Sequence, residues 1–240
     1  MNTISLNQIE DFLLEYKQSI VKKRIEKKDT LEHNFNRLFL DYKQTIRKAI
    51  DEAPFKAPSF NIFRLFGVTR DEVRTHSRFL AELLNSDGRH GQGPLFIRSF
   101  LDYCKSHLDD FPIDFSQSKQ EHWKAATEES VQEGRLDIQI VHQSLGVLCV
   151  IENKIDAPEG DRQLERYLEY MKTHELEYPN QALIYLTIRG KRSFTASDQK
   201  YYRLSYHQDI FSWLHQTQSE IKAPIVLGTI QQYMDIVRKL

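Results

Sequence analysis

Cysteine is scarce in this chain, and its scarcity limits what can hold the fold together. Cys104 and Cys149 are the two cysteines among 240 residues, and neither belongs to a Cys-x-x-Cys pair. We therefore expect no network of structural disulfides, and the composition fits a reducing compartment. Cys149 stands inside an apolar run, which predicts a buried strand position.

Long apolar runs and an excess of charge are also missing. No stretch approaches the roughly 20 apolar residues that span a bilayer. The N-terminal residues Met1 to Phe12 carry neither an apolar core nor a small-residue cleavage site, so we expect a cytoplasmic protein without a membrane partner. The formal net charge is -1. A neutral total does not exclude a nucleic-acid partner, since a basic groove can coexist with an acidic remainder.

What is present suffices for one α/β domain with a helical extension. Residues 5–51 carry apolar side chains at helical spacing and contain no Pro or Gly, which predicts two helices joined near Lys28–Thr30. Their lysine-rich segment from Lys22 to Lys28 is better interpreted as a solvated helix face than as a phosphate contact. We expect residues 1–52 to form the extension and residues 53–240 to form the domain.

The predicted domain begins with helices and continues with strands. After a break that contains Pro54 and Pro58, Thr69 and Glu72 have the spacing of a capping box at the start of a third helix. Alternating or continuous apolar residues predict strands at 135–141, 147–151, 182–188 and 201–205. The predicted helices are 69–85, 95–108, 161–173, 208–219 and 224–239. The short link His142–Gly146 predicts a hairpin of the first two strands.

The second predicted strand ends in an unusual way, with Glu152, Asn153 and Lys154. Residues i and i+2 of a strand share a face and lie about 6.6 Å apart, so Glu152 and Lys154 point into the same space. Asp137 lies near the start of the neighbouring strand of the hairpin. Plausible registers put it on the same side, close to Glu152.

Two carboxylates and a lysine at one strand end suit metal-dependent hydrolysis. Mg²⁺ prefers oxygen ligands, and Asp137, Glu152 and the backbone carbonyl of Asn153 can supply them. A bound ion polarises a phosphodiester and lowers the pKa of a bound water, while Lys154 orients the water or stabilises the developing charge. The simpler alternative is a surface ion pair of Glu152 and Lys154 beside a turn residue, which is the usual explanation of an isolated Glu-x-Lys.

Three segments together resemble the PD-(D/E)xK nuclease superfamily: Gly134-Arg-Leu-Asp137, Val150-Ile-Glu-Asn-Lys-Ile155 and Asp161-Arg-Gln-Leu-Glu-Arg-Tyr167. The sequence is most similar to the bacterial branch known as PD-(D/E)xK nuclease family proteins. Those proteins also tend to carry a segment like Glu72–Ser77 followed by a His-Gly-x-Gly loop, here His90–Gly93. The resemblance covers roughly residues 60–240. Leu136 replaces the proline of the family's pattern, which bonds no metal.

The resemblance implies a restriction-endonuclease-like core, in which helices flank a mixed sheet of at least four strands. It implies the same active site, with Asp137 and Glu152 as metal ligands and Lys154 as the catalytic lysine. Gln163 and Tyr167 match the Gln-x-x-x-Tyr motif of RecB-like nucleases, and their i, i+4 spacing puts both on one helix face. In the alternative, Tyr167 packs in the core and Gln163 is solvated.

The sequence offers further candidate ligands for the metal ion. A glutamate of the first strand is expected to join the site, and both Glu128 and Glu129 are available, with Glu128 favoured by spacing. Glu72 is an additional candidate, although the capping box explains it without function. His76 and His90 could pair on a transition metal, but no cysteine or carboxylate spacing supports zinc.

These residues favour an Mg²⁺-dependent nuclease that acts on DNA, with Mn²⁺ as a substitute ion. The alternative is a catalytically silent nucleic-acid-binding or protein-interaction module that has kept the fold. The complete Asp137, Glu152 and Lys154 set favours the enzyme. A helical scaffold protein would leave these residues unexplained, although the N-terminal helices could mediate a homodimer.

Overall fold

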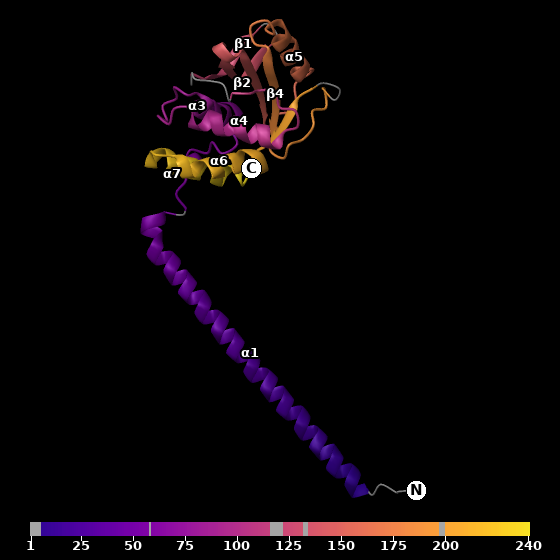
Figure 1. Ribbon diagram of the computed structural model, residues 1–240. Helices are drawn as coiled ribbons and strands as arrows, with labels where there is room; N and C mark the ends of the chain where they lie inside the picture. Colours follow the sequence, from indigo (N-terminus) through magenta and orange to yellow (C-terminus); the bar gives the residue numbers. More distant parts are fainter. Residues whose placement is uncertain (1–5, 58, 116–121, 132–133, 197–199) are drawn as a thin grey trace. The chain divides into compact units, whose positions relative to one another are not determined.

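A computed structural model describes residues 6–57, 59–115, 122–131, 134–196 and 200–240 (Figure 1). The chain divides into two compact units, residues 1–60 and 61–240, and each is described by itself. Within the described residues, no helix combines the length and the apolar character needed to cross a bilayer.

The first unit consists mainly of one helix, α1 (Leu6–Lys56), which is 51 residues long. The prediction of two helices joined near Lys28–Thr30 is wrong. No glycine or proline interrupts this region, Thr30 Oγ1 donates to Glu26 O over 2.8 Å, and Lys28 lies 3.8 Å from Glu32 one turn later. The helix therefore continues through the basic segment.

The second unit is built around a mixed five-stranded sheet in the order β1-β2-β3-β4-β5. Neighbouring strands are antiparallel from β1 to β3 and parallel from β3 to β5. The hairpin of β2 and β3 is confirmed, with Ile138 paired to Ile151. The strands are β1 (Lys124–Val131), β2 (Gly134–His142), β3 (Val147–Lys154), β4 (Asn180–Thr187) and β5 (Tyr202–Ser205).

Helices cover both faces of this sheet (Figure 1). One face packs on α5 (Gln163–Thr173), and its core includes Leu148, Val150 and Tyr167. The opposite face holds the larger core, to which the other helices contribute. These are α2 (Ile62–Leu65), α3 (Arg78–Leu84), α4 (Leu95–His107), the π-helical turn η3 (Tyr206–Ile210), α6 (Phe211–Thr217) and α7 (Pro224–Val237). The π-helical turn η1 (Glu72–Ser77) leads directly into α3.

This arrangement is a restriction-endonuclease-like α/β fold, as expected from the sequence. β3 is central because it pairs with β2 on one side and β4 on the other. Its residues from Val147 to Asn153 are all buried. Burial on both faces explains the continuous apolar run from Val147 to Ile151. The strand extends three residues beyond the predicted end at Ile151, because pairing with β4 continues to Lys154 and Thr187.

The capping box predicted for Thr69 and Glu72 is wrong. The N-cap of η1 is Asp71, whose side chain accepts a hydrogen bond of 2.7 Å from Arg74 N. An aspartate at the N-cap satisfies a free N–H at the helix start as well as threonine does. The side chain of Glu72 is therefore not needed for capping, and it turns toward the end of β3.

Candidate active site

Glu152 and Lys154 lie at the C-terminal end of β3 and share one face of the strand. The side chain of Glu152 is 0% exposed and that of Lys154 is 12% exposed. Lys154 Nζ lies 2.7 Å from Glu152 Oε1 as an ion pair. A buried carboxylate is costly unless it has a charged partner, so this is not a surface ion pair of the kind that contributes little.

Asp137 reaches the same space from β2. Extending the register of Ile138 and Ile151 by one residue places Asp137 opposite Glu152. Asp137 Oδ2 accepts a hydrogen bond of 2.8 Å from Asn153 N. Because the N–H and C=O groups of one strand residue point to the same edge, the Asn153 carbonyl is also directed toward β2 and Asp137.

Burial and the closeness of two carboxylates dominate the electrostatics of this cluster. Burial raises the pKa of Glu152 to about 8, and the Asp137 carboxylate adds to the rise. Within the described residues, Oε1 of Glu152 is paired with Lys154 and Oε2 has no hydrogen-bond partner. Burial lowers the pKa of Lys154, but the carboxylates of Glu152, Asp137 and Glu72 outweigh burial and raise it above its ordinary value. Lys154 is therefore held in its charged form.

Glu72 joins the cluster from η1. Its Oε2 accepts a hydrogen bond of 2.6 Å from Ile155 N, and its Oε1 lies 3.7 Å from Lys154 Nζ. The fold thus brings a residue 80 positions away in sequence to the end of β3, where Lys154 lies near the carboxylates of both Glu72 and Glu152.

The side chain of Asn153 points to the opposite face of β3, away from the carboxylates. Its amide donates to Ser77 Oγ over 2.9 Å and to Glu72 O over 3.2 Å, and its oxygen accepts from the Tyr206 hydroxyl at 2.8 Å. The residue is 0% exposed. This network fastens β3 to η1 and η3, and it fixes the strand segment that carries Glu152 and Lys154.

The Gln163 and Tyr167 pair lies on α5, over the same face of the sheet. Gln163 Nε2 lies 3.0 Å from the Tyr167 hydroxyl, which donates to the carbonyl of Arg135. Gln163 is half-buried, and its oxygen accepts from Gly160 N at 3.2 Å. Tyr167 is buried in the core beneath α5, and Glu152 helps to raise the pKa of its hydroxyl after burial. The pair therefore borders the carboxylates through Tyr167.

Of the other candidates named from the sequence, the two histidines lie outside this cluster. Glu128 and Glu129 lie in β1, but their side chains are outside the described residues. The imidazole of His76 is buried, with its nitrogens 2.9 Å from the Tyr233 hydroxyl and 3.0 Å from Thr69 O, and burial lowers its pKa to about 4. His90 holds its own loop through Asn85 O and Gln92 N. Among the described side chains, no three His, Cys, Asp or Glu residues form a metal-binding group.

A model of the PD-(D/E)XK nuclease superfamily matches residues 60–233. The chain belongs to the PD-(D/E)XK nuclease superfamily. No curated protein and no solved structure shows a significant similarity to it. The match spans η1, β2, β3 and α5, so it includes every element that contributes to the cluster.

Several contacts around the candidate active site are not predicted by any pattern in the sequence. Tyr206 and Ser77 support Asn153 from elements far apart in the chain. Arg70 pairs with Asp156 just beyond β3. Glu159 accepts hydrogen bonds from Phe194 N at 2.8 Å and from Thr195 Oγ1 at 2.6 Å. The hydrogen-bond partner of a polar loop residue cannot be predicted from the sequence, because many polar groups are equally suitable and the tertiary structure decides which one lies within reach.

Proposed function

We propose that this protein is an Mg²⁺-dependent nuclease that hydrolyses phosphodiester bonds of DNA, with Mn²⁺ as a substitute ion. The observation that carries the proposal is the fully buried Glu152 carboxylate, which faces Asp137, is paired with the charged Lys154 through Oε1, and leaves Oε2 without a hydrogen-bond partner among the described residues. A desolvated carboxylate of this kind fits a cation ligand, since a cation would offset the cost of its burial.

The donor set fits a hard divalent ion. Asp137 and Glu152 would hold it, and the Asn153 carbonyl would add a third oxygen, with Glu128 as a further candidate ligand. When bound, the ion supplies a Lewis acid that polarises a phosphate oxygen and lowers the pKa of a water molecule. Gln163 would contact the phosphate side of the site, and Tyr167 would hold Gln163 in place.

Lys154 would act on the reaction rather than on the ion. Its raised pKa keeps it protonated at neutral pH, so it can donate a hydrogen bond to the attacking water or stabilise negative charge on the phosphate. Glu72 was a candidate metal ligand, but its oxygens contact Ile155 N and Lys154. We therefore assign Glu72 to the positioning of Lys154.

The proposal is tested by incubating the full chain with linear duplex, circular duplex and single-stranded DNA, and with RNA. We expect cleavage of DNA in Mg²⁺ and in Mn²⁺, and none in EDTA, because the carboxylates alone cannot activate water. Binding of these substrates without cleavage in either metal would refute the nuclease and leave the silent binding module. Cleavage that persists in EDTA would refute the metal site.

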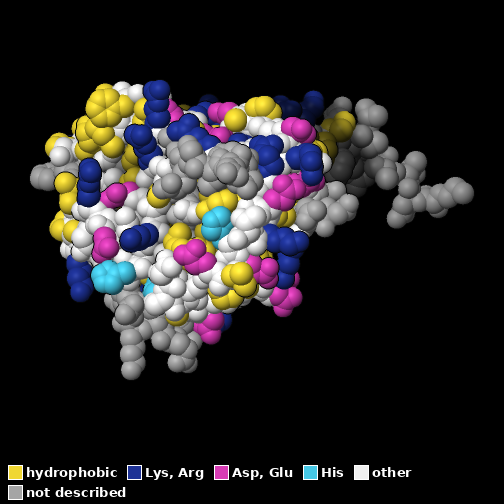
Figure 2. All heavy atoms as spheres, turned by 90° about the horizontal axis from the view of Figure 1, so that it is seen from above, with side chains coloured by type: hydrophobic (Ala, Val, Ile, Leu, Met, Phe, Trp, Pro, Cys, Tyr) yellow, Lys and Arg dark blue, Asp and Glu magenta, His cyan; other side chains and the backbone are white. Residues whose placement is uncertain are grey.

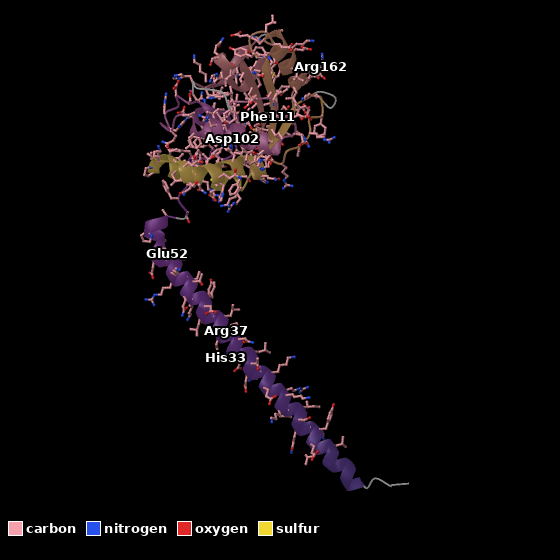
Figure 3. All side chains as sticks on the ribbon, viewed as in Figure 1. His33, Arg37, Glu52, Asp102, Phe111 and Arg162 are labelled. Atoms are coloured by element: carbon pink, nitrogen blue, oxygen red, sulfur yellow. The ribbon has the colours of Figure 1, made fainter. Side chains whose placement is uncertain are left out.

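We further propose that the protein acts in the cytoplasm as a homodimer formed through α1. Large apolar side chains of this helix are exposed at helical spacing, as in Leu31, Phe35, Leu38 and Tyr42. Figure 3 shows side chains such as His33 and Arg37 standing out from the same helix. A helix of 51 residues is about 76 Å long, and an apolar stripe along it would be costly to leave in water.

The dimer predicts a mass in solution of twice 28.4 kDa for the full chain. Phe35→Glu should shift the mass to that of the monomer, because it puts a charge in the middle of the apolar stripe. Gln44→Glu is the matched control, since position 44 lies on the other side of the helix, and its mass should equal that of the wild type. Light scattering measures both. A wild-type chain that is already monomeric at micromolar concentration would contradict the proposal.

A further inference from the structure

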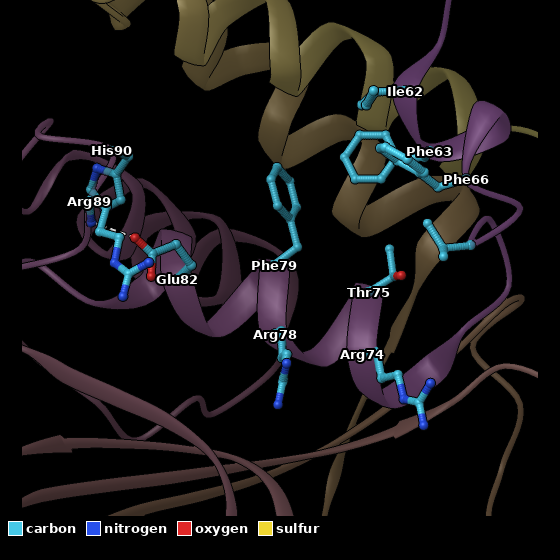
Figure 4. Close-up of a pocket in the computed structure, with 11 residues that line it drawn as sticks. Ile62, Phe63, Phe66, Arg74, Thr75, Arg78, Phe79, Glu82, Arg89 and His90 are labelled. Carbon is cyan, nitrogen blue, oxygen red and sulfur yellow. Dashed lines mark hydrogen bonds between the residues drawn. The ribbon is translucent and has the colours of Figure 1, made fainter.

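A groove of about 630 Å³ lies along α2 and the η1–α3 segment, apart from the carboxylate cluster (Figure 4). Its lining combines two kinds of side chain. The apolar members are Ile62, Phe63, Phe66, Val68 and Phe79, and the charged members are Arg74, Arg78, Glu82 and Arg89. Neither the proposed chemistry nor the dimer uses any of these residues.

The three arginines of the groove are not engaged elsewhere. Within the described part of the second unit, the guanidinium groups of Arg74, Arg78 and Arg89 make neither an ion pair nor a hydrogen bond, and all three residues are exposed. Figure 4 shows Arg74 and Arg78 projecting from the same side of the helical segment. Two like charges one turn apart repel each other, so an anion between or beside them would be stabilised.

The single carboxylate of the groove does not neutralise these charges. Glu82 Oε1 accepts a hydrogen bond from the backbone N–H of Arg89, which ties it to the loop after α3 (Figure 4). The groove therefore carries three positive groups against one engaged negative group. This balance favours an anionic occupant over an apolar peptide helix, which would bury the arginines without a partner.

Aromatic rings line the groove beside the arginines. Phe66 is 69% exposed, although it is a large apolar side chain. Phe63 is held in place by edge-on contacts with Phe79 and Tyr233, with ring centroids 5.7 Å apart in both pairs. Figure 4 shows these rings on one side of the η1–α3 segment and the side chains of Arg74 and Arg78 leaving from the other side, so the groove has an aromatic wall and a positively charged edge. Exposed rings together with positive groups are typical of surfaces that bind a single nucleic-acid strand.

We propose that this groove binds a single-stranded segment of the DNA substrate. The inference rests on the proposed nuclease function and specifies the form of its substrate. Base faces are hidden in a duplex, so Phe66 can stack only on an unpaired base, while the arginines contact the phosphates. The groove and the carboxylate cluster share η1: Glu72 begins it, and Arg74 and Thr75 follow within about one turn. A bound strand would thus contact the same helical turn that carries Glu72.

Binding is tested in EDTA, so that it does not depend on cleavage. A fluorescently labelled single-stranded 12-mer and the corresponding duplex are titrated with the full chain, and anisotropy is measured. Phe66→Ala should weaken single-strand binding roughly tenfold or more and leave duplex binding unchanged, because a stacked base is lost. Phe66→Tyr keeps the ring and should bind the single strand like the wild type. Leu176→Ala, at a fully exposed apolar position, is the control.

The arginines give a second, independent readout. Arg74→Ala combined with Arg78→Ala should lower the slope of log K against log salt concentration by roughly 1.4, since each phosphate contact on a single strand contributes about 0.7. Arg37→Ala combined with Arg47→Ala on α1 is the charge-matched control and should leave the slope unchanged. Unaltered single-strand binding in Phe66→Ala, or equal losses for single strand and duplex, would overturn the proposal. Because cleavage is assayed separately, a protein that binds through the groove but never cuts would refute the nuclease alone.

Discussion

Lys154→Ala should lower the rate of Mg²⁺-dependent DNA cleavage by about 10²–10³-fold, the usual cost of losing one preorganised electrostatic donor. The affinities for Mg²⁺ and for DNA should change little, because Lys154 is not among the oxygen ligands. Asp137→Asn should instead weaken Mg²⁺ binding, since it removes a charged ligand from a hard cation. Single-turnover rates over a range of Mg²⁺ concentrations separate the two effects: the first variant stays slow at saturation, and the second needs more Mg²⁺.

Lys172→Ala is the matched control for the lysine, because Lys172 is exposed at the end of α5 and should leave the rate unchanged. Calorimetric titration with Mg²⁺ provides a measurement that does not depend on activity. If Lys154→Ala cuts as fast as the wild type, the active site has been assigned to the wrong residues. If Asp137→Asn binds Mg²⁺ with unchanged affinity, Asp137 is not a ligand.

Asn153→Ala should lower the free energy of unfolding by about 3 kcal/mol or more, because several buried polar groups lose their partner at once. The side chain of Asn153 makes three hydrogen bonds in a fully buried position, to Ser77 Oγ, Glu72 O and the Tyr206 hydroxyl. Alanine would leave the hydroxyl of Tyr206 and that of Ser77 with fewer partners in a region that water does not reach.

Urea unfolding of the second unit within the full chain measures this loss through the midpoint and slope of the transition. Tyr206→Phe is the informative comparison, since it removes only one of the three bonds and should cost about 1 kcal/mol. Cleavage by Asn153→Ala should also fall, because β3 loses its attachment to η1 beside Glu152 and Lys154. Equal midpoints for Asn153→Ala and the wild type would show that the network does not stabilise the fold.

The strands that carry the candidate site could be predicted because their signals are local. Residues from Arg135 to Val141 alternate between apolar and polar, and Val147 to Ile151 are continuously apolar, as expected for a half-buried strand and a central one. The hairpin followed from the short link between them, and the hairpin brings Asp137 to Glu152. The alternation of side chains along a strand places Glu152 and Lys154 on one face, and the short hairpin link brings Asp137 opposite Glu152.

The prediction for Glu72 failed for a reason that is equally physical. A capping box and a carboxylate that reaches another strand have the same local pattern, and Asp71 was one residue away as a competing N-cap. The choice depends on where Ile155 N and Lys154 lie, 80 or more positions further along the chain. In α1 the error was of another kind. The polar, basic stretch from Lys22 to Lys28 interrupts the apolar stripe, but a helix does not end where it meets neither glycine nor proline, and the first proline of α1 is Pro54.

The sequence by itself determined the α/β class, the hairpin and the Asp137, Glu152 and Lys154 set, because strand periodicity and short turns act over a few residues. The tertiary structure decided which distant groups complete the site. It buried Glu152 against Lys154, set Glu72 on the same lysine and joined Asn153 to Tyr206 and Ser77. Burial and long-range pairing are properties of packed elements, since the desolvation of a carboxylate depends on everything that surrounds it and not on its neighbours in the chain.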